Sequence, residues 1–470
     1  MEISLFSIVW ILLVFRIFIK NKYFSDLFTQ MLSLGIALEL CIDIGYFIKI
    51  KDFNIGYGEI TMICLFMLCM AKGIHKLNLD RKLVISVFII IISVVIGLFL
   101  ALIVPYKGMV FSNENYWDRF YFWGAVPEPL SIGANSIKEL MHLLIFLVIL
   151  LSFFSNRFIS KEKLVNMTFK FFKPFIIIGL LEVVAVSILG MGNVYKSVLI
   201  KIFGDAYINT TSVIGNRLCG LKSEPSFYAY ALMLMFLTIC VSNDASKKKK
   251  HIWLSIISLE LFMSRSFSMI ICVLFLVATY YFHIYSTGKQ SKRTKFWLWA
   301  FIGVFFGAAV LFVTVSSGIL GENYILSRIM SFGKVISNLD INGWEGDQAF
   351  LLIDSSSRIR LISIIECFKQ CLHRPLFGLG LGTNYTHGSL PTVLSQIGLI
   401  ATFFSYRILF FTLKPTNKYY RLNILVWLGC QVFITNGMFS LYGLQNILLV
   451  ILLRNICQVD KIGLEVEIKI

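Results

Sequence analysis

The sequence predicts an all-helical, polytopic integral membrane protein, because it is far more apolar than a soluble chain and its apolar runs recur from end to end. Its 470 residues are 57% hydrophobic and 15% charged, with a mean hydropathy of +0.80. In a soluble chain about a quarter of the residues are charged. Because no stretch is left over for a soluble domain, we expect residues 1–470 to form a single polytopic membrane domain.

The apolar runs predict about 13 transmembrane helices (12 to 14), since each run approaches the roughly 17 to 25 residues that cross a bilayer. The first run is interrupted by Arg16 and lacks a small-residue cleavage site, so we expect a retained span rather than a signal peptide. In order, the predicted spans are 3–19, 27–48, 57–71, 83–104, 137–155, 168–190, 225–242, 252–262, 267–285, 296–315, 391–413, 422–437 and 445–453.

The positive charges predict the orientation, because Lys and Arg are enriched in cytoplasmic loops. When alternate loops are assigned to the cytoplasm, with the lysine run 247–250 among them, these short loops hold more than half of the 43 Lys and Arg residues. The N-terminus is therefore expected outside and the C-terminus in the cytoplasm. The net charge of +17 reflects this topology, and no nucleic-acid partner is expected.

Three predicted external loops have substantial length: 105–136, 191–224 and 316–390. The first is rich in aromatic residues, which are typical either of an interfacial belt or of a sugar-stacking surface. The third is long enough to require structure of its own. Within it, helical periodicity over 355–372 predicts a helix that Asp354 or Ser355 can cap and Pro375 ends.

The segment 217–227 is the strongest candidate for a site, because charged residues stand there at the mouth of a span. Arg217 and Glu224 flank a polar loop, and Pro225 is at home in the first turn of a helix. Ser223 or Ser226 can cap the open amides of that helix. Gly220 allows the backbone to approach another element or a ligand closely. Each residue alone also has a purely structural explanation: Arg217 as an arginine at the membrane interface, and Glu224 as a residue at the start of a helix.

Four arginines are expected to converge on the outer side: Arg217, Arg265, Arg358 and Arg360. A guanidinium offers a planar fork that binds phosphate oxygens bidentately and stays charged. The enrichment of Lys and Arg in cytoplasmic loops does not explain arginines on the outer side. We therefore expect these four arginines to bind a diphosphate. Lipid headgroups are the alternative partner.

Glu224 and His387 are the candidate catalytic residues, because each can take or give a proton if its pKa approaches neutrality. Further acids lie within predicted spans or at their mouths, where an unpaired carboxylate is expensive. They are Glu39, Asp43, Glu59, Glu182 and Glu260. These acids are the best argument for a transporter.

The glycine-rich stretch around Gly378, Gly380 and Gly382 lacks the preceding strand and the spacing of a dinucleotide fingerprint. It favours a flexible turn that leads to the next span. The cysteines fall mostly inside apolar runs and lack metal-ligand spacing, so neither a zinc site nor a disulfide framework is expected.

These motifs together resemble a family over roughly residues 210–401. Arg217, Gly220 and Glu224 to Ser226 resemble the R-x-x-G-x-x-x-E-P-S segment of bacterial O-antigen and capsular polysaccharide polymerases of the Wzy type. Residues 264–266 resemble the Ser-Arg turn of that family. Residues 374–382 with His387 resemble the P-L-x-G-x-G-x-G segment and the histidine signature shared with O-antigen ligases, a related superfamily.

The resemblance implies a metal-independent glycosyltransferase of GT-C-like architecture, without a cofactor, that uses sugars carried on undecaprenyl diphosphate. Its substrates would be a lipid-linked oligosaccharide donor and acceptor at the outer face of the bacterial cytoplasmic membrane. A chain-length regulator and a flippase are the protein partners implied. Gly220, Pro225, Ser226, Gly378, Gly380 and Gly382 would position the backbone.

Two alternatives remain open at this level. An O-antigen ligase would move finished glycan to another acceptor, but Gly388, Gln396 and Ala401 differ from the ligase pattern. A lipid-linked oligosaccharide flippase or other secondary transporter would use the intramembrane acids, although the repeats and broken helices typical of transporters are not seen in the sequence. Between the two candidate bases, we favour Glu224, with His387 as a positioning group.

Overall fold

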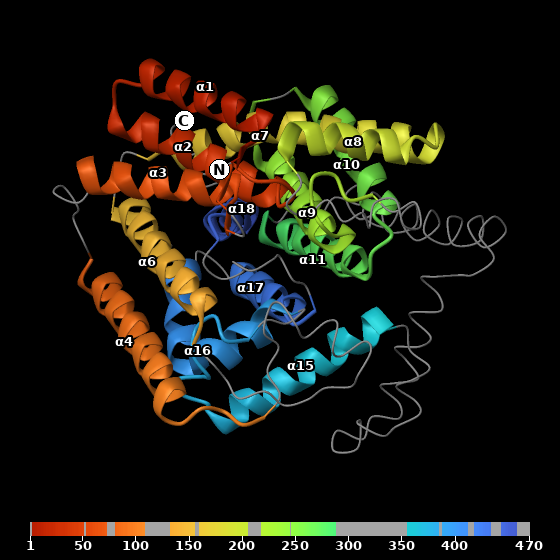
Figure 1. Ribbon diagram of the computed structural model, residues 1–470. Helices are drawn as coiled ribbons and strands as arrows, with labels where there is room; N and C mark the ends of the chain where they lie inside the picture. The colour runs from red at the N-terminus through yellow and green to blue at the C-terminus, as the bar shows by residue number, and fades with distance from the viewer. Residues whose placement is uncertain are drawn as a thin grey trace.

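The computed structural model describes residues 2–50, 53–72, 80–108, 132–155, 159–204, 218–244, 246–287, 355–384, 388–411, 418–433 and 443–457. These residues are mostly helical, as predicted (Figure 1). The predicted span 296–315 lies outside the described residues. Each of the other predicted spans corresponds to a helix.

The first half of the chain forms a series of helices. They are α1 (Leu5–Lys20), α2 (Phe24–Cys41), α3 (Tyr57–Lys72), α4 (Arg81–Ile103), α6 (Ala134–Ser155), α7 (Lys161–Glu182) with the π-helical extension η2 (Val183–Ile188), and α8 (Gly192–Phe203). Capping residues fix where α1, α4 and α7 begin, because the side chains of Ser4, Asp80 and Ser160 each accept a hydrogen bond from a backbone N–H of the first turn. Pro174 lies inside α7.

The second half continues the series. Its elements are α9 (Pro225–Val241), α10 (Lys247–Met263), α11 (Phe267–Thr287), α15 (Ser355–His373), α16 (Ser389–Tyr406) with η3 (Arg407–Phe411), α17 (Lys418–Cys430) and α18 (Gln445–Cys457). The helix predicted at 355–372 in the large loop is confirmed as α15, which ends two residues before Pro375.

Two features were not predicted from the sequence. A small antiparallel sheet joins β1 (Glu2–Ile3), β2 (Ile48–Ile50) and β3 (Phe53–Ile55), whose strands are too short to show a period-two pattern in the sequence. The predicted loop 191–224 contains α8, which packs beside α1. The described start of this loop is therefore helical.

The helices α9 and α18 form the centre of the molecule. Almost every side chain of α9 from Tyr228 to Leu237 is buried, and Leu448 to Leu453 of α18 are buried without a break. Figure 1 shows both helices surrounded by α2, α7 and α11, while α4, α15 and α16 lie together at the other end of the molecule. A helix apolar on all sides belongs in a core, which explains this placement.

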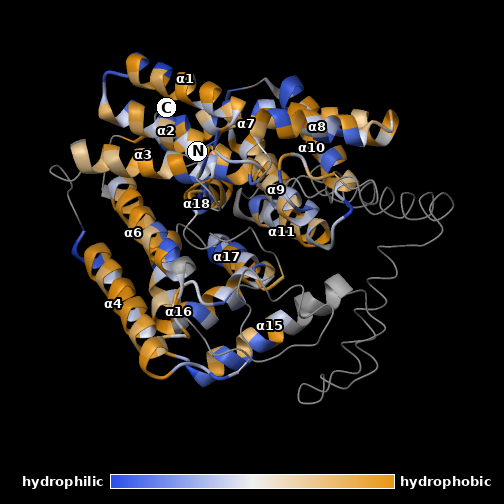
Figure 2. Cartoon of the chain, in the orientation of Figure 1, coloured by the Kyte–Doolittle hydropathy of each residue, from blue (hydrophilic) through white to orange (hydrophobic). Residues whose placement is uncertain are grey.

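Among the described residues, four helices are long and apolar enough to cross a membrane by length and composition: Phe24–Cys41, Arg81–Ile103, Ser136–Phe154 and Ser389–Phe410. Large apolar side chains are exposed along α1 and α4, among them Leu12, Phe15, Phe88 and Phe99. Figure 2 shows the hydrophobic colouring over the outer faces of α4 and α1. Such a surface suits lipid better than water.

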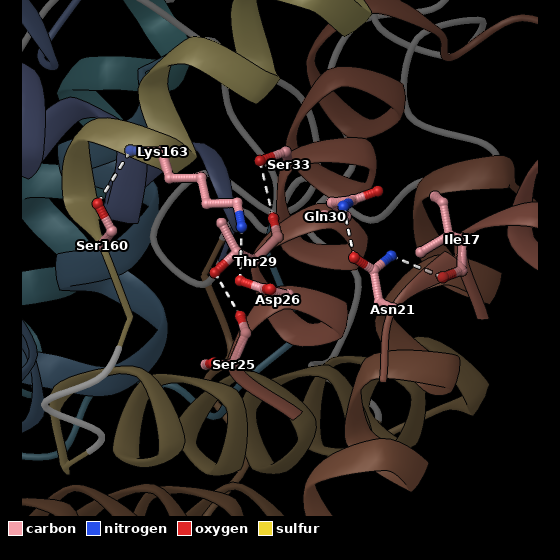
Figure 3. Close-up of polar contacts among 9 residues, drawn as sticks. All are labelled: Ile17, Asn21, Ser25, Asp26, Thr29, Gln30, Ser33, Ser160 and Lys163. Carbon is pink, nitrogen blue, oxygen red and sulfur yellow. Dashed lines mark hydrogen bonds and ion pairs between the residues drawn. The ribbon is translucent and has the colours of Figure 1, made fainter. Parts of the chain in front are cut away.

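The helix ends that the charge rule assigns to the cytoplasm contact one another. Lys163 Nζ lies 2.5 Å from Asp26 Oδ1, so the start of α7 meets the start of α2 (Figure 3). In the same view Gln30 donates to Asn21 at 2.7 Å, which links α2 to the segment after α1. Asn166 of α7 accepts hydrogen bonds from Ser242 Oγ and the Asn243 N–H at the end of α9.

The helix ends assigned to the outside also contact one another. Lys138 near the start of α6 pairs with Glu59 near the start of α3 at 2.8 Å. The Leu444 N–H before α18 donates to the Glu39 carboxylate near the end of α2 at 2.8 Å. Leu390 N–H at the start of α16 donates to Gln431 O after α17 at 3.0 Å. These contacts join helix ends that the predicted topology assigns to the same side of the membrane.

Several helix boundaries were predicted wrongly: α7 begins at Lys161 rather than at 168, α17 ends at Cys430 rather than at 437, and α2 ends early. The span predicted at 27–48 ends at Cys41, because the backbone then leaves the helix to pair with a distant segment. The N–H groups of Asp43 and Ile44 both donate to Leu221 O, at 3.1 and 3.3 Å. This pairing joins the end of α2 to the segment that forms the candidate site.

Candidate functional site

Residues 218–226, here called the hub segment, lead into α9 and are held from several sides. Leu218, Cys219 and Leu221 are buried. Because buried backbone N–H groups need partners, the segment requires acceptors from elsewhere in the chain. Two carboxylates supply them, one from α7 and one from the end of α2.

Glu182, the last residue of α7, binds the first part of the hub segment. Its Oε1 accepts the Cys219 N–H at 3.3 Å and its Oε2 accepts the Gly220 N–H at 2.5 Å. The Glu182 side chain is buried, with 1% of the residue exposed. A buried N–H without an acceptor is costly, so these two bonds fix the backbone at Gly220.

Gly220 makes the close approach that the sequence predicted. Its φ of +60° lies in the left-handed region, which glycine adopts without steric cost. A Cβ on Gly220 would lie 2.5 Å from Cε2 of Tyr228, so the hub backbone rests directly against that ring. The close neighbour is a side chain of α9 itself.

Tyr228 links the hub segment to a second buried carboxylate. Its hydroxyl donates to Glu260 Oε2 of α10 at 2.8 Å. Gly179 of α7 leaves the space for this pair, because a Cβ there would lie 2.9 Å from the Glu260 carboxylate. Helices α7, α9 and α10 are therefore joined around the hub segment through Glu182, Tyr228 and Glu260.

Asp43 binds the second part of the hub segment. Its Oδ1 accepts the Ser223 N–H at 2.5 Å, and its Oδ2 accepts the Ser223 hydroxyl at 3.1 Å. Lys222 Nζ lies 3.7 Å from Asp43 Oδ2 and donates to Glu39 O at 3.0 Å. A cation at the carboxyl end of α2 also interacts favourably with the helix dipole.

Glu224 is the N-cap residue of α9, and Pro225 is its first helical residue, as predicted. The predicted capping by Ser223 or Ser226 is wrong, because α9 has no side-chain capping bond. Ser226 Oγ instead donates to Glu224 Oε2 at 2.8 Å, and Ser223 serves Asp43. Both serines therefore bind carboxylates and help to orient them.

Arg265 lies in the turn between α10 and α11, next to the start of the hub segment. The Leu218 N–H donates to Met263 O at 3.1 Å, which joins the two. Arg265 has a φ of +46°, the one left-handed backbone among the non-glycine residues that the structure describes. Such a conformation costs free energy in an L-residue and is enriched at functional sites.

The glycine-rich segment forms a second buried element rather than the flexible turn that the sequence predicted. The Leu379 N–H donates to Ser395 O at 2.7 Å, and the Gly380 N–H donates to Gln396 O at 3.0 Å. Helix α16 breaks its helical backbone at Gly398, with φ +70°, and this releases carbonyl groups to the neighbouring segment. Gly378 and Gly382 also have left-handed φ values.

Asn384 joins this segment to α15. Its Nδ2 lies 2.6 Å from Gln370 Oε1 and 3.0 Å from Ser395 Oγ, and Gln396 donates to its backbone carbonyl. Asn384 and Gln370 are fully buried. The polar junction fixes α15 against α16, and with it the helix that carries Arg358 and Arg360 in its first turns.

The structure brings together only part of the predicted site. Glu224, Gly220, Pro225 and Ser226 belong to one buried assembly that also touches the Arg265 turn. Arg217 and His387 lie outside the described residues. The predicted convergence of four arginines on a diphosphate therefore stays a prediction.

The acids that favoured a transporter in the sequence have protein partners. Asp43 and Glu182 hold the hub segment, and Glu260 binds Tyr228. Glu39 accepts the Leu444 N–H, and Glu59 pairs with Lys138. Each of these carboxylates joins separate segments, which weakens the argument for transport, although in the described part of the chain Oε1 of Glu39 and Oε1 of Glu260 are buried without a hydrogen bond.

The sequence analysis missed Lys222 and the role of Asp43. A lysine that is only 7% exposed and lies two residues before Glu224 is unusual for a loop. Its position in the otherwise apolar run 218–222 was the available signal. Asp43 was counted among the intramembrane acids, although its partner lies 180 residues away in the chain.

The described part of the site offers a carboxylate, a hydroxyl donor to it and a neighbouring arginine turn. Such a set of groups suits proton transfer beside an anionic group.

A comparison with models of known protein families finds no match, and a search of curated proteins finds none either.

Proposed function

We propose that the protein is a membrane glycosyltransferase that joins undecaprenyl-diphosphate-linked oligosaccharide repeat units into an O-antigen, capsular polysaccharide or exopolysaccharide. The observation that carries the proposal is the fixed presentation of Glu224 at the start of α9, in a segment whose first residue, Leu218, bonds to Met263 just before the Arg265 turn. The resemblance of 217–227, 264–266 and 374–387 to polymerases of the Wzy type supplies the substrate class.

In the proposed reaction the growing glycan on its lipid diphosphate is the donor, and a lipid-linked repeat unit supplies the acceptor hydroxyl. The hydroxyl oxygen forms a bond to the anomeric carbon of the donor, while the bond from that carbon to the diphosphate breaks. Glu224 takes the hydroxyl proton. Arg217, Arg265, Arg358 and Arg360 stabilise the charge on the departing diphosphate.

The proposed topology has about 13 spans in a GT-C-like arrangement, with the N-terminus outside and the C-terminus in the cytoplasm of a bacterial cell. Two observations support it: the four helices that are long and apolar enough to span a membrane, and the contacts between helix ends assigned to the same side. Under this topology the hub segment faces outward, where lipid-linked repeat units meet.

The O-antigen ligase is the second candidate of the same chemistry, and a flippase is the candidate of a different class. The partnered acids argue against a proton-coupled flippase, because Asp43, Glu182 and Glu260 bind the hub segment and Tyr228 rather than facing a transport path. Gly388 and Ala401 differ from the ligase pattern, which favours the polymerase.

The glycan of a strain lacking the protein distinguishes the three candidates. A polymerase defect leaves single repeat units attached to the final acceptor. Unattached polymer would indicate a ligase, and the absence of exported glycan would indicate a flippase. The purified protein is then incubated with lipid-linked repeat units, and a ladder of products is expected. Restoration of polymer by the wild-type chain but not by Glu224→Ala links the phenotype to the site.

A further inference from the structure

The part of the hub segment that leads into Glu224 is held by two charged residues, Asp43 and Lys222, here called the clamp. Asp43 binds both the N–H and the hydroxyl of Ser223, the residue directly before Glu224. Lys222, directly before Ser223, binds Glu39 O and lies near the Asp43 carboxylate. Two consecutive residues ahead of Glu224 are therefore anchored to the end of α2.

Backbone pairing strengthens the same connection. Leu221 O accepts the N–H groups of Asp43 and Ile44, so α2 and the hub segment are joined in both directions. Asp43 keeps 29% of its side chain exposed, whereas Lys222 keeps 6%. The clamp thus stands at the rim of the buried assembly, between the protein interior and the face that carries Glu224.

We propose that Asp43 and Lys222 are positioning residues for Glu224, which hold its backbone where the carboxylate can take a proton from the acceptor hydroxyl. This inference rests on the proposed function. A general base must lie within hydrogen-bond reach of its proton, and small displacements of catalytic groups lower turnover strongly. Neither residue needs to touch substrate for this role.

The charges of the two clamp residues contribute separately. Asp43→Asn keeps the shape of the side chain but weakens the charge-assisted bond from the Ser223 N–H. Lys222→Met keeps the aliphatic length and removes the cation, which leaves Asp43 without its ion pair and Glu39 O without its donor. We expect each change to lower kcat by about 10- to 100-fold while the KM for the lipid-linked donor changes little.

The experiment combines turnover on purified lipid-linked repeat units with hydrogen–deuterium exchange of residues 218–227 in the full-length protein. Asp43→Asn and Lys222→Met are compared with the conservative variants Asp43→Glu and Lys222→Arg. The matched control is Asp26→Asn, which removes a carboxylate at the opposite end of the same helix, where it pairs with Lys163. The control is expected to leave both measurements unchanged.

We expect the clamp variants to lose exchange protection at Ser223 and to lose turnover together, and the conservative variants to recover part of both. Unchanged exchange in Asp43→Asn and Lys222→Met would overturn the clamp. Lost protection with normal kcat would overturn the positioning role. If the wild-type protein makes no polymer, the proposed function fails and so does the role for Glu224, whereas the exchange data still report whether the clamp exists.

Discussion

At the scale of single residues, Gly220 shows how closely the hub segment is packed. Any other residue there meets two costs, the left-handed φ of +60° and a collision with the Tyr228 ring. We expect Gly220→Ala to lower the free energy of unfolding by about 1 to 3 kcal/mol. Thermal unfolding of the purified protein measures the change.

The control for Gly220→Ala is Gly429→Ala in α17. A Cβ on Gly429 meets nothing within 4 Å, so the substitution adds helix propensity without a clash. It should leave the melting temperature unchanged or raise it slightly. Equal stability of the two variants would show that the hub backbone can relax away from Tyr228.

The choice between Glu224 and His387 as general base is also decided at this scale. Glu224→Gln keeps the shape of the side chain and removes the proton acceptor, so we expect turnover to fall about 10²- to 10⁴-fold with donor binding nearly intact. Single-turnover kinetics on lipid-linked repeat units measure it. If Glu224→Gln stays active while His387→Gln is dead, the two roles exchange.

Arg265 offers a test of the diphosphate hypothesis. Arg265→Lys keeps the charge and loses the planar fork, which bidentate binding of phosphate oxygens requires. Loss of one charge-assisted contact is worth about 1.5 to 3 kcal/mol, or roughly ten- to a hundred-fold in rate. We expect that loss in turnover at unchanged protein level. Normal turnover would indicate that the guanidinium contacts only lipid headgroups or protein.

At the scale of helices, a charge cluster at Asp244 joins the middle of α7 to the segment that follows α9. Its carboxylate lies 3.0 Å from Lys170 Nζ and 3.3 Å from Lys173 Nζ. Partial burial opposes ionisation, but the hydrogen bonds and charges of the two lysines outweigh it and lower the pKa of Asp244. Its contribution to stability is therefore present above the pKa of the unfolded chain, about 3.9, and is lost as the pH falls through the lower folded value.

We accordingly expect Asp244→Asn to destabilise the protein at neutral pH by up to about 1 kcal/mol, and the difference from wild type to vanish once the pH falls below the lowered pKa of Asp244 in the folded protein. Thermal unfolding over this pH range measures it. In a variant that already lacks Lys170 and Lys173, the same substitution should have little effect. A pH-independent difference would contradict the ion-pair account.

The sequence predicted helices better than their ends. Most apolar runs became helices at the expected places, since their length and hydropathy are local properties. The end of α2 was misplaced because its boundary depends on pairing with Leu221, far along the chain. Helix α8 was missed because it is short and only one face is apolar, which resembles a polar loop with scattered hydrophobic residues.

For the candidate site, the sequence predicted the unusual positions but not their partners. The backbone preferences of Gly220 and Pro225 predicted a close approach of the backbone to another element and the start of a helix. The contacts of Glu182, Glu260 and Asp43 join separate helices, so no local pattern in the sequence encodes them. The acids therefore suggested transport until their partners were known.

At the scale of the whole molecule, the topology is the prediction on which the proposed function depends. A single cysteine at Gly343, in the loop predicted at 316–390, should react with an impermeant reagent added outside, because the charge rule assigns that loop to the exterior. A cysteine at Lys249 should react only after the membrane is opened. Both are tested after the native reactive cysteines are replaced. Reaction of the Gly343 position only from the cytoplasm would contradict the catalytic scheme.

The contacts of α2 set an order of events during synthesis. Its end binds Ser223, 180 residues later in the chain, and Leu444, 405 residues later than Glu39. At roughly 5 to 20 residues per second, the ribosome needs about 9 to 36 seconds to supply the first partner and about 20 to 80 seconds to supply the second. Glu39 and Asp43 are without these partners during that interval, so one of the first helices to be synthesised is among the last to reach its final contacts.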